Sequence, residues 1–317
     1  MKKLFCALGS FLLSISSCSK TTQPPPAPEP AEWLPESLPL RADVKKLWIN
    51  VIRGTATDDI WLLANVNLER VQERWVFHFD GSQWTDVTTQ LPARARTAVF
   101  PISKTDVWAV GAQGTAAHYD GKTWTQHQIP NFYYDFVDVF ARGREVWVAA
   151  AGARVVHYDG QAWNVLTPPE LAETSVHELW GTAQQVLIPV NTKDTMKHIA
   201  RYRGGVWSKE PVGPGGLTLI HGSSDTDIWA LSRQGQGYHF DGTSWKSFPT
   251  IDKISLWSLS VAGPDRALAV GDKGTILRWD GHAWLRSASG TEAQLVSVYA
   301  PTGGKALVGG DRLYRQK

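Results

Sequence analysis

A five-residue motif, Asp-Gly-x-x-Trp, recurs along the chain at intervals of about 40 residues. Complete copies begin at Asp80, Asp120, Asp159, Asp241 and Asp280, and a degenerate copy begins at Arg203. A second motif, Asp-[Ile/Val]-Trp, begins at Asp59, Asp106 and Asp227, with a near match at Glu145. Repetition with this period, carried by aromatic residues and glycines, predicts an all-β fold, a β-propeller of four-stranded blades.

One repeat, residues 135–166, shows how such a blade is encoded. It contains four short runs rich in β-branched and aromatic residues, at 136–140, 146–150, 154–158 and 162–166. Asp159 and Gly160 between the last two runs predict a type I′ hairpin turn, in which φ is positive at both central residues. Trp163 then lies on the same strand face as Val156, where its ring can cover the joint between two blades.

The same order of runs begins at Leu47, Arg96, Asp135, Val176, Leu217, Leu256 and Leu295. The last of these units has three runs, and a candidate for its outer strand lies near the other end of the chain, around Trp33. We therefore predict a seven-bladed propeller of four-stranded antiparallel blades, in residues 32–317, whose last blade is closed by the N-terminal strand. A six-bladed ring with a disordered tail is the alternative.

The first residues have the layout of a secretory signal, so we expect residues 1–17 to be a lipoprotein signal peptide. Lys2 and Lys3 precede an apolar run at 4–15 that is too short to span a bilayer. Residues 15–18 (Ile-Ser-Ser-Cys) resemble the lipobox of bacterial lipoproteins, and this resemblance implies lipidation of Cys18. An ordinary signal peptide with an incidental cysteine is the alternative.

Residues 18–31 are polar and rich in proline, which predicts a semi-rigid tether between the membrane and the propeller. Ser19 after the cysteine resembles lipoproteins sent to the outer membrane, which implies the periplasmic side or the cell surface. With Cys6 removed and Cys18 lipidated, no disulfide can form.

Lys2 and Lys3 account for the whole formal net charge of +2, so the processed chain would be formally neutral. This balance argues against a nucleic-acid partner and against a polybasic membrane patch. The expected partners are the membrane, through the lipid anchor, and a protein or glycan ligand. We expect a monomer.

The Asp-Gly-x-x-Trp motif resembles a shortened Asp-box of sialidase-type (BNR) propellers, and residues 106–111 look like the repeats of secreted propeller lipoproteins. The resemblance implies a turn between third and fourth strands, on the face opposite a catalytic pocket. The five motif aspartates are therefore expected to be structural turn residues. Sialidases need an Arg-Ile-Pro-like motif that is missing here, so we predict no catalytic residues. A sialidase-like glycoside hydrolase or lyase, or an envelope assembly factor, is the alternative.

Four blades place a histidine two residues before the motif aspartate, and two others have arginine there. These residues are His78, His118, His157 and His239, with Arg201 and Arg278. A metal needs ligands within about 2 Å, and copies in neighbouring blades lie too far apart for that. We therefore expect hydrogen bonds across the blade interface, with no metal and no cofactor.

Departures from the repeat indicate where a ligand binds. The second-to-third connections are long at 65–74 and 191–197, and the passages into the second and third blades carry arginines and aromatics. Trp75 and Trp180 fall outside the two regular tryptophan series. The candidate ligand-binding residues are Phe132, Tyr133, Tyr134, Asp135, Arg94, Arg96, Arg70, Trp75 and Lys193. The sequence thus predicts a non-catalytic, lipid-anchored binding or scaffold protein of the cell envelope.

Overall fold

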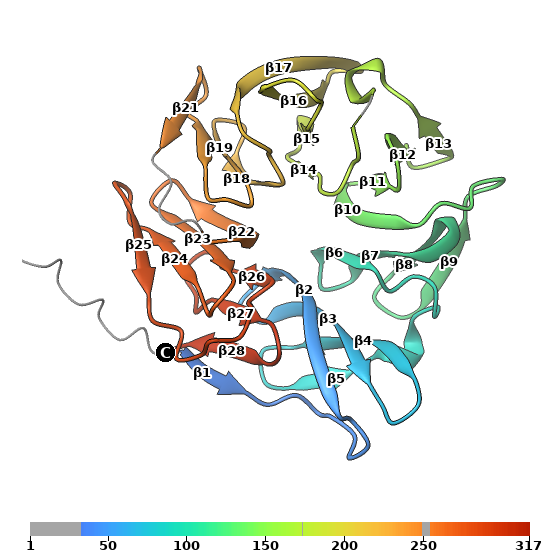
Figure 1. The fold of residues 1–317 in the computed structure, drawn as a ribbon. Coiled ribbons are helices and arrows are strands. Elements are labelled where there is room, and N and C mark those ends of the chain that lie inside the picture. Colours follow the sequence, from blue (N-terminus) through green and yellow to red (C-terminus); the bar gives the residue numbers. More distant parts are fainter. Residues whose placement is uncertain (1–32, 173, 249–253) are drawn as a thin grey trace, which may run out of the picture.

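Seven four-stranded antiparallel sheets form a ring around a central axis (Figure 1). The computed structural model describes residues 33–172, 174–248 and 254–317. In each sheet the strands follow one another from the axis outwards. The predicted seven-bladed β-propeller is therefore confirmed. The expectations for residues 1–17, for residues 18–31 and for Cys18 lie outside the described residues.

The first four blades begin with β2, β6, β10 and β14. Blade one contains β2 (Lys46–Ala56), β3 (Asp59–Asn67), β4 (Gln72–Phe79) and β5 (Trp84–Asp86). Blade two contains β6 (Ala98–Ser103), β7 (Asp106–Val110), β8 (Thr115–Tyr119) and β9 (Trp124–Gln128). Blade three contains β10 (Phe136–Arg142), β11 (Glu145–Ala150), β12 (Arg154–Tyr158) and β13 (Trp163–Leu166). Blade four contains β14 (Trp180–Gly181), β15 (Gln185–Val190), β16 (Met196–Arg203) and β17 (Val206–Pro214).

The last three blades begin with β18, β22 and β26. Blade five contains β18 (Leu219–Ser224), β19 (Asp227–Leu231), β20 (Gly237–Phe240) and β21 (Trp245–Phe248). Blade six contains β22 (Leu256–Gly263), β23 (Arg266–Gly271), β24 (Ile276–Trp279) and β25 (Trp284–Ser287). Blade seven contains β26 (Ser297–Tyr299), β27 (Leu307–Gly309), β28 (Leu313–Gln316) and β1 (Trp33–Glu36). Short 3-10 turns lie at η1 (Thr88–Gln90), η2 (Ala112–Gly114) and η3 (Pro169–Leu171).

The N-terminal strand closes the ring, as the sequence predicts. β1 pairs antiparallel with β28, with Trp33 opposite Gln316. The Trp33 side chain is 7% exposed and packs into the core of blade seven. The Glu36 carboxylate accepts hydrogen bonds from Arg315 and, at 2.6 Å, from the indole N–H of Trp84 in blade one. The strand therefore completes the last blade and links it to the first.

The Asp-Gly motifs form four-residue connections, so the predicted type I′ turn is wrong. In blade three Tyr158 pairs with Trp163, which leaves residues 159–162 as the connection. Asp159 Oδ1 accepts the backbone N–H groups of Gln161 and Ala162, both at 2.8 Å. These bonds from the side chain stabilise the turn. Within the turn only Gly160 has a positive φ, of 92°, whereas a type I′ turn requires two such residues. The aspartates at 80, 120, 241 and 280 make the same pair of bonds.

Tryptophan rings cover the joints between blades, as expected for Trp163. Its ring meets Trp108 of the preceding blade edge-on, at 5.9 Å between centroids. Equivalent edge-on contacts join Trp61 to Trp124, Trp147 to Trp207 and Trp229 to Trp284. The tryptophans of the second strands are thus the anchor points of inter-blade packing.

Three of the four motif histidines hydrogen-bond within their own blades and the fourth, His157, only stacks on Trp147, so the predicted bond across the blade interface is wrong. His118 Nε2 lies 2.9 Å from Asp106 Oδ1, and its ring stacks on Trp108 at 4.4 Å. The same aspartate–histidine bond occurs between Asp59 and His78 and between Asp227 and His239. The partner is the first residue of the Asp-[Ile/Val]-Trp motif because strands two and three are neighbours within one sheet.

We expect Trp33→Ala to destabilise the protein by about 3 to 5 kcal/mol, because it empties a buried site in the closing strand. Leu34→Ala is the matched control, since Leu34 is in the same strand but 50% exposed, and should cost about 0.5 kcal/mol or less. Urea denaturation followed by tryptophan fluorescence measures both. Equal, small losses would mean that closure by β1 contributes little.

Candidate binding site on the propeller axis

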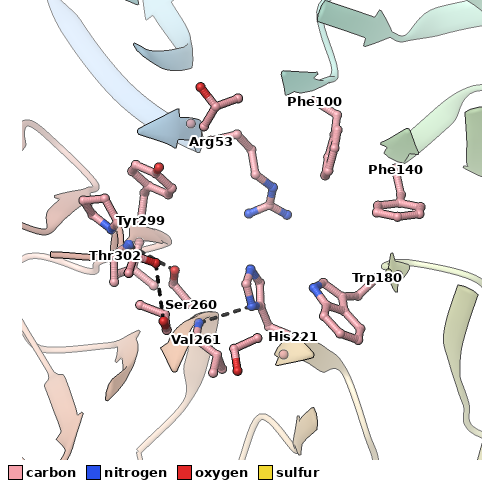
Figure 2. A pocket seen from close by; sticks show the side chains of 18 of the residues that line it. Arg53, Phe100, Phe140, Trp180, His221, Ser260, Val261, Tyr299 and Thr302 are labelled. Atoms are coloured by element: carbon pink, nitrogen blue, oxygen red, sulfur yellow. Dashed lines mark hydrogen bonds between the residues drawn. The ribbon is translucent and has the colours of Figure 1, made fainter. Parts of the chain in front are cut away.

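One position on each innermost strand faces the axis at a common level. Each of these residues pairs with the equivalent residue of the adjacent second strand, which is Trp61 in blade one and Trp108 in blade two. The seven residues are Arg53, Phe100, Phe140, Trp180, His221, Ser260 and Tyr299. All seven line one cavity of about 440 Å³ on the axis (Figure 2).

The cavity opens beside the turns that join first and second strands. Thr57 and Thr302 from these turns, with Ser223 at the end of β18, line the cavity and are exposed to solvent. The Asp-Gly turns lie on the same face as the turns between first and second strands. In blade two, a Cβ placed on Gly121 of the Asp-Gly turn would lie 2.7 Å from Thr105, which is in the turn between β6 and β7. The sequence expectation placed ligand binding on the opposite face, so this cavity lies elsewhere than predicted.

Three hydrogen-bond donors point into the cavity from different blades. The Arg53 guanidinium extends toward the His221 ring, and the indole N–H of Trp180 faces the same space (Figure 2). His221 Nδ1 accepts the backbone N–H of Val261 at 3.2 Å, so the neutral ring carries its proton on Nε2. Burial, and then the Arg53 charge, lower the pKa of His221 to about 3, which keeps the ring neutral.

The cavity has one apolar wall and one more polar wall. Phe100 and Phe140 meet edge-on at 5.2 Å, and Trp180 continues this wall. On the other side, Ser260 Oγ accepts the N–H of Ala300 at 3.0 Å, and burial raises the pKa of Tyr299 to about 12. The Tyr299 hydroxyl therefore remains protonated.

Side chains near this level cap the free edges of the innermost strands. Each such strand has an edge facing the axis that pairs with no other strand, and its N–H groups need acceptors. Each acceptor comes from the preceding blade. The pairs are Ser297 with Ile52 N (2.8 Å), Ser258 with Val298 N (3.2 Å), and Asp138 with Leu179 N (3.1 Å).

Two carboxyl groups occupy this capping layer. Glu178 and Asp138 stand two residues before the cavity-lining position, as Ser258 and Ser297 do in their blades. Burial, and then the neighbouring Asp138, raise the pKa of Glu178 to about 8 against the opposing effect of Arg53. Burial also raises the pKa of Asp138. Glu178 therefore favours the neutral, protonated form near neutral pH, and burial shifts the pKa of Asp138 in the same direction.

Two residues of the predicted site are buried, so the expectation that they contact a ligand is wrong. Phe132 is 4% exposed and packs on Phe136 at 5.5 Å. Trp75 is 2% exposed, with its indole N–H donated to Glu73 at 2.7 Å. Both rings fill hydrophobic cores between or within blades, which local sequence could not distinguish from exposed loop aromatics.

The remaining predicted residues lie on the face opposite the axial cavity. Tyr133 is 76% exposed, and Tyr134 stacks under the Arg154 guanidinium at 3.9 Å. Asp135 Oδ1 accepts the N–H of Gln113 at 2.9 Å, and Arg96 donates to the carbonyl of Leu91 at 2.7 Å. Arg70, Arg94 and Lys193 are exposed.

The predicted long loop at 65–74 is largely strand. β3 runs to Asn67 and β4 begins at Gln72, so the pairing continues and only residues 68–71 form the connection. The connection in blade four is residues 191–195, between β15 and β16. Blade one therefore extends a hairpin rather than a flexible loop on this face.

Sequence reasoning missed Arg53 and His221. Trp180 falls outside the two regular tryptophan series, but it was not among the predicted ligand-binding residues. The usable signal was an alignment of the seven units at the axial position, where arginine and histidine each occur once among aromatics and a serine. Neither forms a motif with its sequence neighbours, because all seven residues come from different blades.

Within the described ranges, no group of three or more His, Cys, Asp or Glu side chains is placed to hold a metal ion. No helix in these ranges has the length and apolar character needed to cross a membrane.

No protein-family model and no curated protein matches the sequence. Solved structures do share the fold. YCF48 bound to D1 peptide is 16% identical, with 91% of this chain and 95% of that chain covered and a TM-score of 0.68. YCF48 from Cyanidioschyzon merolae is 14% identical, with 90% and 98% covered and a TM-score of 0.64.

A third similar structure is the extracellular domain of BT4673, described as a one-component system, from B. thetaiotaomicron. It is 14% identical, with 89% of this chain and 39% of that chain covered and a TM-score of 0.65. At such identities the likeness shows the β-propeller fold alone.

We expect Glu178 to make stability depend on pH. Its folded pKa of about 8 lies above its ordinary value of 4.5, so the folded state retains a proton that the unfolded state has lost. Unfolding free energy should therefore fall as pH rises from about 4.5 to about 8, by at most about 1.4 kcal/mol per unit, and level off above.

Urea denaturation at several pH values tests this expectation. Glu178→Gln should flatten the slope in this window, because glutamine has no proton to lose. Glu292→Gln is the control, since Glu292 is an exposed glutamate, and should keep the wild-type slope. An unchanged slope in Glu178→Gln would refute the assignment.

Proposed function

We propose that this chain is a non-catalytic binding protein that holds part of a protein ligand in its axial cavity. The observation that supports the proposal is the convergence of Arg53, His221 and Trp180 beside an aromatic wall in one pre-formed cavity. A rigid ring lowers the entropy cost of binding because its site needs little ordering. A propeller of the same fold, YCF48, has been solved with D1 peptide, which is in keeping with a binding role.

The buried carboxyls argue against catalysis. A glycosidase needs two carboxyl groups that flank the scissile bond, one of them ionised. Asp138 instead accepts a backbone N–H of the next blade, and the backbone of Ile220 hydrogen-bonds Glu178. Both groups serve the role that serines serve in blades six and seven.

A hydrolase is the second candidate because of one observation. Glu178 lines the cavity and its pKa is raised, which is a property of general acids. Glycoside hydrolysis that Glu178→Gln abolishes would favour this candidate over the binding protein.

We further propose that the protein is a lipoprotein of the cell envelope, anchored through Cys18 and held off the membrane by residues 18–31. The basis is the sequence pattern around Cys18 and the proline-rich composition that follows. Metabolic labelling with a palmitate analogue should mark the wild-type protein and leave Cys18→Ser unmarked. Label on Cys18→Ser, or none on either protein, would contradict the anchor.

A pull-down from solubilised envelope tests which face binds. We expect Trp180→Ala to lose the partner, because it removes a wall and a donor of the axial cavity. The Tyr133→Ala, Tyr134→Ala double variant is the matched control on the opposite face and should retain it. Loss only in the tyrosine variant would move the site to that face, and recovery of a glycan would change the ligand class.

A further inference from the structure

We infer that the axial cavity is a carboxylate site for a polypeptide C-terminus. Arg53, His221 and Trp180 would bind the free α-carboxylate, and the last side chain would pack against Phe100 and Phe140. This inference rests on the proposed binding function and deepens it by naming the group that is recognised.

The donors face the same space, and those of Arg53 and Trp180 lack acceptors. Among the described residues, neither the Arg53 guanidinium nor the Trp180 indole N–H makes a hydrogen bond or ion pair. His221 Nδ1 accepts the N–H of Val261, and the His221 ring also has a hydrogen bond with the backbone of Gly222. The free donors of Arg53 and Trp180 face one space and are satisfied together by a group that only accepts. A carboxylate fits, because its two oxygens accept several bonds and match the fork of an arginine.

The charge of Arg53 is only partly offset, because the Arg53 guanidinium forms no ion pair with any described residue. The acids that face it are Glu178 and Asp138, and both accept hydrogen bonds from backbone N–H groups of the next blade. Burial raises the pKa of each carboxyl, that of Glu178 to about 8, so burial opposes the ionisation of both. The neutral ring of His221 adds no positive charge. A monovalent anion therefore balances the cavity.

The shape and lining favour a chain end over a sugar acid. About 440 Å³ on the axis accommodates a terminal residue that enters end-on, with its side chain on the Phe100–Phe140 wall. A sugar would need partners for several hydroxyl groups. Ser260 Oγ already accepts the N–H of Ala300, and Thr302 Oγ1 already donates to the carbonyl of Ala262, so each hydroxyl keeps only part of its hydrogen-bonding capacity.

Isothermal titration of the full-length protein in detergent tests the inference with matched peptides. The probes are acetyl-Ala-Ala-Phe with a free carboxylate and the same peptide with a C-terminal amide. We expect the acid to bind about tenfold or more tightly than the amide, because charged hydrogen bonds are lost with the amide. Equal affinity would overturn the carboxylate assignment.

Variants test whether the preference for the acid peptide depends on the axial cavity. Arg53→Met should weaken binding of the acid by about tenfold or more and leave the amide unchanged. Arg94→Gln, an exposed arginine on the opposite face, should change neither. Arg53→Lys keeps the charge near the cavity and should recover part of the affinity, which separates loss of the site from loss of the fold. A loss of acid binding in Arg94→Gln equal to that in Arg53→Met would overturn the inference.

A third probe, glucuronate, distinguishes the two sources of a carboxylate. Weaker binding of glucuronate than of the peptide acid supports a chain terminus, and tighter binding overturns it in favour of an acidic sugar. If neither anion binds while Trp180→Ala still abolishes the pull-down, the carboxylate inference fails and the proposed binding function stands. If the pull-down is also unaffected, both fail.

Discussion

The ring depends on satisfying the free edges of its innermost strands. Each first strand pairs on one side only, and its other edge faces the axis with unpaired N–H groups. In several blades a side chain of the preceding blade accepts one of these bonds. Ser258, Ser297 and Asp138 do so from equivalent positions. These hydrogen bonds link neighbouring blades. The cavity-lining position, two residues further along each first strand, takes no part in them and is free to vary.

Structure and recognition are consequently separated within each repeat. The Asp-[Ile/Val]-Trp and Asp-Gly-x-x-Trp motifs hold the outer strands together through the carboxylates and the stacked rings, as Asp106, His118 and Trp108 show. None of these groups needs to change when the ligand changes. The axial position carries a different set of side chains, with Arg53 and His221 among its polar members. Such a division lets one repeat maintain the fold while the site takes its own chemistry.

The sequence predicted the features that every blade repeats, but not the cavity that single residues of different blades form together. Seven blades and closure by the strand around Trp33 follow from local hairpin patterns that recur with a fixed period. The turn type was wrong because the Asp159 carboxylate, and not a left-handed backbone, holds the connection. Phe132 was expected to be exposed, but tertiary packing buries it. Local patterns do not indicate the axial cavity, since its residues are about 40 apart in the chain and meet only when the ring closes.

The charged group in the cavity lowers the stability of the folded protein and also enables the cavity to bind an anion. A half-buried guanidinium whose charge is only partly offset is unfavourable. A serine at position 178 would remove one of the two acids that partly offset the charge of Arg53. Glu178 and Asp138 offset the charge only to the extent that they ionise, which burial opposes. A bound anion supplies the missing charge without rearranging the ring. Its binding would therefore stabilise the folded state, and the strength of that coupling is set by how far the two buried acids stay protonated.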